Sequence, residues 1–241
     1  MLKFIGSGSA FNTKLGNNSA YYKSGNQMLL IDCGSNVFQR IKENNLLEGI
    51  EHIHVLITHT HADHIGSLAD LILYTYYSHG EFAKSKVTVH SPFDTGVSEI
   101  LKLNGCIKGY HHDENLVGGS SDIIIINESL TISFDRNSHV EELNTYNVFI
   151  LSNKNPIWYS SDCNKISNNV LRVINYGGYK QVYIDTCKAD YEGNVHLSLR
   201  KLSELIKPEF RDKVWCMHLD EGFNREEAEE LGFNVVINEF N

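Results

Sequence analysis

The stretch ITHTHADHIGS at residues 57–67 constrains the fold more than any other part of the sequence. It follows an apolar, strand-like run at 53–58 and then places several titratable side chains close together. A strand that only packs does not carry polar groups at this density, because each must find a partner or face water. Imidazole and carboxylate groups are ligands for Zn²⁺ and neighbouring metals, so the stretch predicts a metal site at a strand end. The candidate ligands are His59, His61, Asp63 and His64.

A structural alternative explains these residues one at a time. Asp63 can be the N-cap of a following helix, and the histidines can lie in an exposed loop. That alternative suits a single histidine better than it suits H-x-H-x-D-H as a unit. Residues spaced by two in an extended loop point the same way, and the turn into a helix directs Asp63 and His64 toward the same cavity.

Apolar and β-branched runs between turn signals predict many short strands and fewer helices. Strands occur in adjacent runs as well as in alternation with helices, so two sheets with helices outside fit better than one doubly wound sheet. The predicted strands are 2–6, 19–23, 27–32, 53–58, 86–90, 123–127, 130–135, 146–152, 157–160, 181–185 and 213–217. The predicted helices are 36–47, 64–77, 93–103, 166–175, 197–207 and 225–231.

Nothing in the sequence divides it into parts. Its 241 residues, 41% hydrophobic, suffice for an ordinary core, and without a linker or repeat we expect a single domain at residues 1–241. The longest apolar run, 123–126, is too short to cross a bilayer, and we expect neither a signal peptide nor a membrane partner. Five cysteines without a C-x-x-C spacing fit a reducing, cytoplasmic compartment and argue against a thiolate zinc site.

The net charge bears on the kind of partner. Proteins that grip a long phosphate backbone normally present Lys and Arg in excess. Here the formal net charge is -9. A small anionic substrate held by metal ions is therefore easier to reconcile with the composition than a polynucleotide, although a local basic patch is compatible with an acidic total.

HTHADH, with Asp32 in IDCG upstream, resembles the metallo-β-lactamase superfamily of binuclear metallohydrolases. GSGSAFNTKLGNNSAYY near the start is similar to the opening of its tRNase Z branch. The resemblance implies an α/β fold, an αββα sandwich of two mixed sheets with helices on the outer faces and the site along one edge. Four further residues follow in the order of that branch: His139 in NSHVEE, Asp162 in YSSDCN, His196 in VHLSL and His218 in CMHLD.

Carried over by position, the resemblance implies two Zn²⁺ ions, with Mn²⁺ as the alternative, bridged by Asp162. Two cations close together need an anionic bridge, and a carboxylate supplies one. Retention of His61, where oxygen-reducing diiron relatives carry a glutamate, favours hydrolysis over redox chemistry. One ion takes His59, His61 and His139, and the other takes Asp63, His64 and His218.

The resemblance also implies roles beside the metals. Asp63 orients the attacking hydroxide, and Asp32 holds ligand imidazoles in orientation from beneath the site. His196 lies beside the substrate phosphate as hydrogen-bond donor or proton donor to the leaving oxygen.

Each of the later residues also has a structural alternative. His139 can be a loop residue, Asp162 a helix N-cap, and His218 a satisfied histidine at a strand end. Likewise, Asp32 can simply end a strand, and His196 can be an N-terminal helix residue that precedes Ser198. The segment 111–113, His-His-Asp, is a rival source of a ligand, but without a preceding strand we expect it to form a mobile loop.

Departures from tRNase Z narrow the substrate. The His-Glu-Ala-Thr segment of that branch corresponds to 184–187, where Ile184 replaces a catalytic histidine. The chain between His139 and Asp162 suffices only for two strands and a turn, so the tRNA-binding arm is absent. The Pro and Arg of the early loop and the Ser-x-Arg-Tyr after the last histidine are missing as well. These losses argue against tRNA 3′ processing.

The compact chain is similar to tRNase Z-like cyclic-nucleotide phosphodiesterases, including the anti-Pycsar enzymes, which are homodimers that counter antiphage signalling. By analogy with the scissile bond of tRNase Z, we expect hydrolysis of 3′,5′-cyclic CMP, UMP, AMP and GMP to 5′-monophosphates. A tRNase Z-type endoribonuclease, a carboxylic ester or lactone hydrolase and a non-catalytic binding module remain alternatives. The apolar positions of 64–77 suit either a dimer face or burial against the chain's own sheet.

Overall fold

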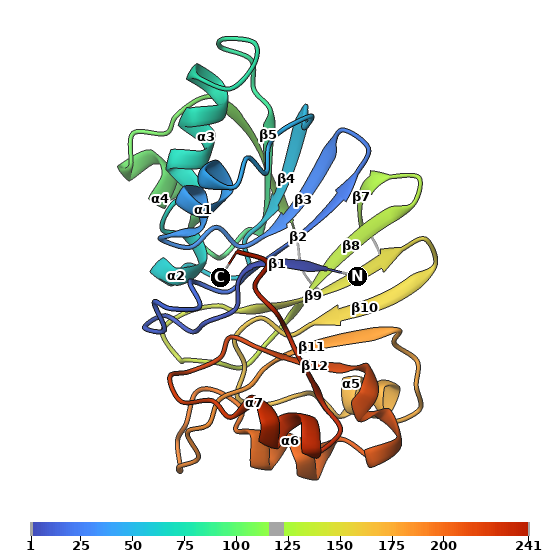
Figure 1. Cartoon of the computed structure of the whole chain (residues 1–241). Helices are drawn as coiled ribbons and strands as arrows, with labels where there is room; N and C mark the ends of the chain where they lie inside the picture. Colours follow the sequence, from blue (N-terminus) through green and yellow to red (C-terminus); the bar gives the residue numbers. More distant parts are fainter. Residues whose placement is uncertain (1, 116–122, 241) are drawn as a thin grey trace. The chain divides into compact units, whose positions relative to one another are not determined.

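The computed structural model describes residues 2–115 and 123–240. The chain divides into two compact units, Met1–Leu116 with Asn238–Asn241 and Val117–Ile237, which we call the first and second units. Each unit contains one mixed sheet and its own helices (Figure 1). That the whole chain folds as a single domain stays a prediction.

The sheet of the first unit has six strands in the order β1-β2-β3-β4-β5-β6. β1 to β3 pair antiparallel, and β3 to β6 pair parallel. The strands are β1 Lys3–Gly6, β2 Ser19–Ser24, β3 Gln27–Ile31, β4 His52–Leu56, β5 Val87–Pro92 and β6 Tyr110–Asn115. The helices are α1 Val37–Glu43, α2 Ala62–Ile65, α3 Leu68–Tyr77 and α4 Val97–Leu103.

One apolar core joins this sheet to α1, α3 and α4 (Figure 1). Ile53 and Val55 of β4 alternate with polar neighbours and are buried in it, together with Leu68 and Leu71 of α3. Burying one such side chain contributes about 1.5–3 kcal/mol. Of the two alternatives for the apolar positions at 64–77, the structure therefore shows burial against the chain's own sheet.

The sheet of the second unit has seven strands in the order β13-β12-β11-β10-β9-β8-β7. β7 to β10 are antiparallel and β10 to β13 are parallel. The strands are β7 Ile124–Asn127, β8 Leu130–Arg136, β9 Tyr146–Ser152, β10 Asn155–Tyr159, β11 Gln181–Asp185, β12 Val214–Met217 and β13 Asn234–Val235. The helices are α5 Asn168–Ile174, α6 Leu199–Leu205, the 3₁₀ helix η1 Pro208–Lys213 and α7 Arg225–Glu230.

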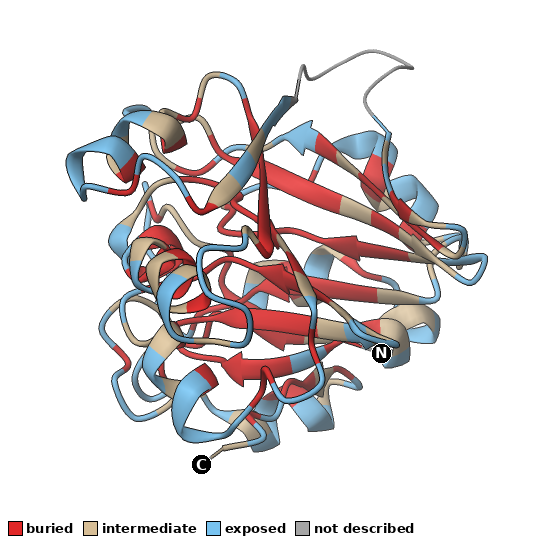
Figure 2. Cartoon of the chain, turned by 90° about the horizontal axis from the view of Figure 1, so that it is seen from above, coloured by how far each residue is buried: buried red, intermediate tan, exposed pale blue. Residues whose placement is uncertain are grey.

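Side-chain caps begin the helices of the second unit. Ser167, Ser198 and Asn224 accept hydrogen bonds from the backbone N–H groups three residues later, which satisfies donors that a helix start leaves open. The central strands of both sheets are buried along most of their length, β6 and β7 at the sheet edges are largely exposed or half-buried, and the helices expose one side (Figure 2). No helix within 2–115 and 123–240 has the length and apolar character needed to cross a bilayer.

The predicted strands are confirmed with small shifts of their ends, and the sequence missed β6, β13 and the 3₁₀ helix η1. The helix predicted at 64–77 is split, because the backbone N–H of Ser67 donates to Cys33 O (3.1 Å) instead of continuing the helix. Gly34 lies beside this break, and a Cβ there would meet the carbonyl oxygen of Asp63 at 1.9 Å. A glycine is therefore required where the loop after β3 approaches α2.

The prediction of a mobile loop at 111–113 is wrong. His111, His112 and Asp113 lie in β6, where they pair in register with Thr88, Val89 and His90 of β5. Their polarity hid the strand, but polar side chains suit a strand at the edge of a sheet.

Candidate metal centre

The first unit gathers the predicted ligands of HTHADH at the end of β4. His59 and His61 lie in the loop after the strand, and Asp63 and His64 lie on α2. The His59 and His64 rings are 4.0 Å apart between centroids, and His59 Nε2 is 3.0 Å from His61 Nδ1. His64 Nε2 lies 3.3 Å from Asp63 Oδ2. The loop and the helix turn therefore direct these side chains to one place, as the spacing predicts.

Asp32, at the end of β3, fixes His64 from behind. It is fully buried, and its Oδ2 lies 2.8 Å from His64 Nδ1. The backbone N–H of Thr58 donates to its Oδ1 (2.9 Å), and the Thr58 hydroxyl donates to its Oδ2 (2.9 Å). Burial raises the pKa of Asp32, and the contacts with His64 and Thr58 oppose that rise. With Nδ1 of His64 held by a carboxylate, its Nε2 is the atom left to bind a metal.

The second unit gathers three more predicted ligands at the ends of β8, β10 and β12. His139, Asp162 and His218 follow those strands and are almost completely buried. Asp162 Oδ2 lies 3.7 Å from His139 Nε2 and 3.4 Å from His218 Nε2. One carboxylate oxygen thus lies near two imidazole nitrogens from different strands, which is the arrangement that a bridging ligand needs.

The other ring nitrogens of these histidines face acceptors. His139 Nδ1 is 2.9 Å from the carbonyl oxygen of Val195, and His218 Nδ1 is 3.3 Å from Asp185 Oδ1. An acceptor on Nδ1 fixes the imidazole tautomer and leaves the Nε2 lone pair for a metal. Burial lowers the pKa of His139, which favours the neutral form that ligates.

Sequence reasoning missed Asp185, the last residue of β11. This carboxylate is fully buried, and its Oδ2 accepts from the backbone N–H of Cys163 (2.9 Å) and lies 2.6 Å from His196 Nδ1. Burial alone would raise the pKa of Asp185, but His196 and His218 outweigh it and the pKa is lowered. Desolvation works to lower the pKa of His196, and Asp185 outweighs it, so that pKa is raised.

A signal for Asp185 is present in the sequence. QVYID at 181–185 repeats the pattern of QMLLID at 27–32, an apolar strand that ends in an aspartate. In both places the aspartate lies behind a histidine, His64 in the first unit and His196 in the second. The structural alternatives fail for two residues: the N-cap of α5 is Ser167 rather than Asp162, and His196 lies outside α6, whose N-cap is Ser198.

Three non-glycine residues at these strand ends adopt left-handed backbone conformations. The φ angles are 61° at Asp32, 53° at Ser161 and 56° at His218. Such conformations cost about 1–3 kcal/mol each and persist where the surrounding structure holds them. In both units the backbone is therefore strained where the candidate ligands and their supports lie.

The clusters of His and Asp are consistent with a binuclear metal site. Buried imidazole and carboxylate groups supply the nitrogen and oxygen ligands that Zn²⁺ and Mn²⁺ accept. Within the described residues no metal-binding group contains a cysteine, and none of the five cysteines forms a disulfide. The donor set therefore fits the group that the sequence predicts.

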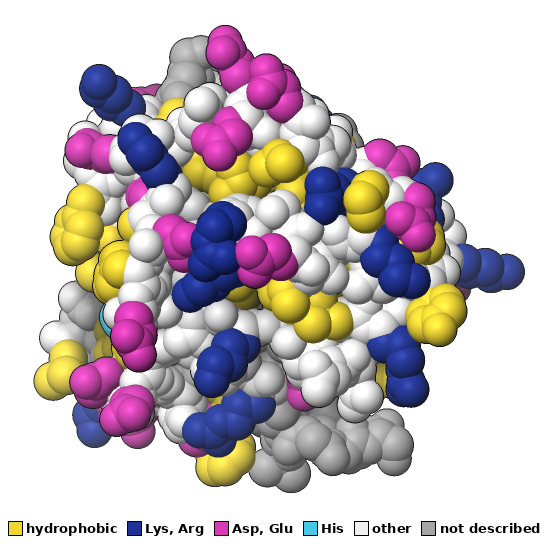
Figure 3. Space-filling view, turned by 90° about the horizontal axis from the view of Figure 1, so that it is seen from below, with side chains coloured by type: hydrophobic (Ala, Val, Ile, Leu, Met, Phe, Trp, Pro, Cys, Tyr) yellow, Lys and Arg dark blue, Asp and Glu magenta, His cyan; other side chains and the backbone are white. Residues whose placement is uncertain are grey.

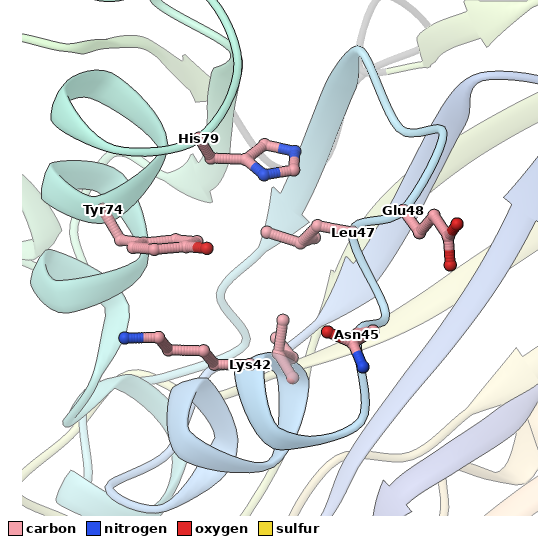
Figure 4. Close-up of a pocket in the computed structure, with 7 residues that line it drawn as sticks. Lys42, Asn45, Leu47, Glu48, Tyr74 and His79 are labelled. Atoms are coloured by element: carbon pink, nitrogen blue, oxygen red, sulfur yellow. The ribbon is translucent and has the colours of Figure 1, made fainter.

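Each unit contains a cavity. One in the second unit, of about 550 Å³, has His139 in its wall together with the 136–144 loop, Lys165 and Val195. The other, in the first unit, has a volume of about 340 Å³, and Tyr74 and His79 point into it (Figure 4). None of the candidate ligands lines the cavity of the first unit, whereas His139 lines the cavity of the second unit.

Comparisons with known proteins agree with this arrangement. The family described as "Anti-Pycsar protein Apyc1" matches residues 1–240. The anti-Pycsar protein Apyc1 of Bacillus phage BSP38 is 32% identical over 232 residues, which cover 90% of this chain and 88% of that protein.

Solved structures show the fold. The metallo-β-lactamase fold protein YhfI of Bacillus subtilis aligns with a TM-score of 0.72 at 18% identity, covering 98% of this chain and 94% of that one. Human short-form tRNase Z aligns with a TM-score of 0.70 at 14% identity, covering 98% and 95%. The prediction of a metallo-β-lactamase fold with two mixed sheets is thus confirmed. By the match along residues 1–240, the chain belongs to the anti-Pycsar protein Apyc1 family.

Proposed function

We propose that the protein is a binuclear metal-dependent phosphodiesterase that hydrolyses 3′,5′-cyclic nucleotides to 5′-monophosphates and so counters cyclic-nucleotide antiphage signalling. The observation that carries the proposal is the position of Asp162 Oδ2 near Nε2 of both His139 and His218. Membership of the Apyc1 family, which counters Pycsar signalling, supports a cyclic nucleotide as the substrate. The proposed substrates are cyclic CMP, UMP, AMP and GMP.

Seven side chains would hold two Zn²⁺ or Mn²⁺ ions. His59, His61 and His139 would hold one ion, Asp63, His64 and His218 the other, and Asp162 would bridge them. When bound, the two ions supply positive charge for the phosphate oxygens and lower the pKa of water from about 15.7 toward about 7.

The chain's own residues handle the protons. Asp63 accepts a hydrogen bond from the attacking water and directs its oxygen at phosphorus. His196 donates a proton to the 3′ oxygen as the bond between phosphorus and that oxygen breaks. The proton released by the attacking water balances the one that His196 gives up. Asp185 raises the pKa of His196 and so favours the protonated form of the donor.

The surface and the connections support a small substrate rather than tRNA. On the face shown in Figure 3, Lys and Arg side chains are scattered among Asp and Glu side chains. Between His139 and Asp162 the chain forms only β9, β10 and their turns. No arm is built in this interval, all of which is described.

Two further proposals follow from the sequence. We propose that the protein is a homodimer. Light scattering during gel filtration tests this by measuring the molar mass of the protein in solution. We also propose that the protein acts in the cytoplasm, because all five cysteines are free and buried.

The decisive experiment incubates the protein, loaded with Zn²⁺ or Mn²⁺, with the four cyclic nucleotides, a precursor tRNA, bis-p-nitrophenyl phosphate and a carboxylic ester. We expect 5′-monophosphates from the cyclic nucleotides, loss of this activity in His61→Ala and normal activity in His79→Ala. Trimmed tRNA with intact cyclic nucleotides would replace the proposal with a tRNase Z activity. Ester cleavage alone would replace it with an ester hydrolase.

A further inference from the structure

Two loops of the second unit carry His139 and Asp162. Asn137, in the loop of His139, forms hydrogen bonds with the backbone of the loop of Asp162. Nδ2 of Asn137, which follows β8, donates to the carbonyl oxygens of Ser160 (2.6 Å) and Asp162 (2.8 Å). Its Oδ1 accepts from the backbone N–H of Ser138 (2.9 Å). Both protons of the amide and its oxygen are therefore in use, which fixes the orientation of the side chain.

The loop of Asp162 also forms hydrogen bonds with the backbone of the loop of His139. The backbone N–H of Asn164 donates to Ser138 O (3.0 Å), and Nδ2 of Asn164 donates to His139 O (3.3 Å). The hydroxyl of Ser138 donates to Asn164 Oδ1 (3.0 Å). The loop of His139 thus holds the backbone of Asp162, and the loop of Asp162 holds the backbone of His139.

The strained backbone at Ser161 belongs to the same arrangement. Asn137 contacts two carbonyl oxygens that belong to residues 160 and 162, with Ser161 between them at a φ of 53°. The left-handed residue turns the chain so that both oxygens face one amide group. The hydrogen bonds of Asn137 offset part of the cost of about 1–3 kcal/mol that such a conformation carries.

We propose that Asn137 is a positioning residue that sets the spacing between His139 Nε2 and Asp162 Oδ2, and with it the affinity of the site for metal. This inference rests on the proposed metal centre. The role differs from those of Asp32 and Asp185, each of which orients imidazole rings through a carboxylate. Asn137 instead holds two backbone carbonyl oxygens of the neighbouring loop, and its amide nitrogen supplies both of the donors.

The test is the Asn137→Asp substitution in the full chain. The carboxylate has nearly the same shape, supplies no donor and places negative charge against two carbonyl oxygens. Metal affinity is measured by competition with a chromophoric chelator for Zn²⁺, and the environment of the ions by the absorption of bound Co²⁺. We expect an apparent affinity lower by about 10–100-fold, the range found when groups that orient ligands are lost.

Asn175→Asp is the matched control. Asn175 is also half-buried in the second unit and also ties two segments together, since its Nδ2 donates to Leu205 O (2.9 Å) and its Oδ1 accepts from Lys207 N (2.9 Å). It contacts no loop that carries a ligand. We expect both variants to lower the melting temperature, and only Asn137→Asp to change metal affinity and the Co²⁺ spectrum.

Asn164→Asp provides a milder variant if Asn137→Asp fails to fold. It removes one donor, the longer bond to His139 O, and we expect a smaller loss of affinity. Wild-type affinity in both folded variants, or in Asn164→Asp where that alone folds, would overturn the inference. A wild-type chain that binds two metals but leaves cyclic nucleotides intact would overturn the proposed substrate and leave the role of Asn137 standing.

Discussion

His196 Nδ1 lies 2.6 Å from Asp185 Oδ2, while the other oxygen of the same carboxylate lies 3.3 Å from His218 Nδ1. One buried aspartate therefore holds the proposed proton donor and a proposed metal ligand together. Because the carboxylate favours a protonated His196, Asp185 couples the proposed proton donor to the proposed metal centre.

The Asp185→Asn substitution tests this coupling. A neutral amide no longer stabilises the imidazolium, so the pKa of His196 falls and the donor loses its proton at a lower pH. We expect the alkaline limb of the pH–rate profile to move to lower pH and kcat to fall by about 10²-fold, the lower range for loss of general acid catalysis. The measurement is kcat and KM for cyclic nucleotide hydrolysis between pH 5 and 9, with metal content determined in parallel.

His196→Gln is the companion variant, because it removes the donor and leaves Asp185 in place. We expect it to lose the alkaline limb altogether. An Asp185→Asn profile that overlays the wild type, at equal metal content, would show that Asp185 does not control the proton on His196.

The contrast between HTHADH and Asp185 shows what sequence alone reveals. His59 to His64 form their cluster within one loop and one helix turn, so local spacing suffices to predict it. Asp185 lies beside His218, 33 positions away, because β11 pairs with β12 in a register that sets Asp185 opposite Met217. Strand register sets this contact, and no local pattern encodes the register. The strand at 111–113 was missed for the same reason, since its partners lie in β5.

Asp32→Asn is expected to weaken metal binding while the fold persists. The carboxylate near His64 Nδ1 makes the ring a better ligand, and an amide loses that charge. We expect an affinity for Zn²⁺ lower by about 10–100-fold. The number of Zn²⁺ ions bound per chain after gel filtration, measured by inductively coupled plasma mass spectrometry, reports the loss of affinity. Asp70→Asn, an exposed acid in the first turn of α3, serves as control and is expected to retain full metal content.

A pair of histidines outside the proposed centre makes stability depend on pH. His54 Nδ1 lies 3.0 Å from His90 Nε2, and burial, the largest cause, lowers the pKa of each to about 4. In the unfolded chain both titrate near 6.5, so the unfolded state binds more protons between these values. Stability is therefore full above about pH 6.5 and is lost as the pH falls toward about 4.

Urea unfolding of the metal-free protein at pH 7 and pH 5 measures this effect, because chelation removes the pH-dependent stabilisation by bound metal. We expect the free energy of unfolding to fall by about 2 kcal/mol from this pair, after discounting His54 for its exposure to solvent. His54→Gln should show a smaller fall than the wild type. Equal pH dependence in the two proteins would mean that other groups account for the loss.

The β9–β10 hairpin turns through two non-glycine residues in left-handed conformations, with φ angles of 49° at Asn153 and 63° at Lys154. Asparagine tolerates this region, whereas the Cβ of lysine is crowded there. We expect Lys154→Gly to stabilise the fold by about 0.5–1 kcal/mol, the balance of relieved strain and added freedom of the unfolded chain. Lys154→Ala keeps a Cβ and should melt with the wild type. The turn lies at the start of β10, whereas Asp162 follows the end of that strand. We therefore expect the glycine variant to hydrolyse cyclic nucleotides at the wild-type rate. A changed rate would show that the turn is coupled to the proposed metal centre.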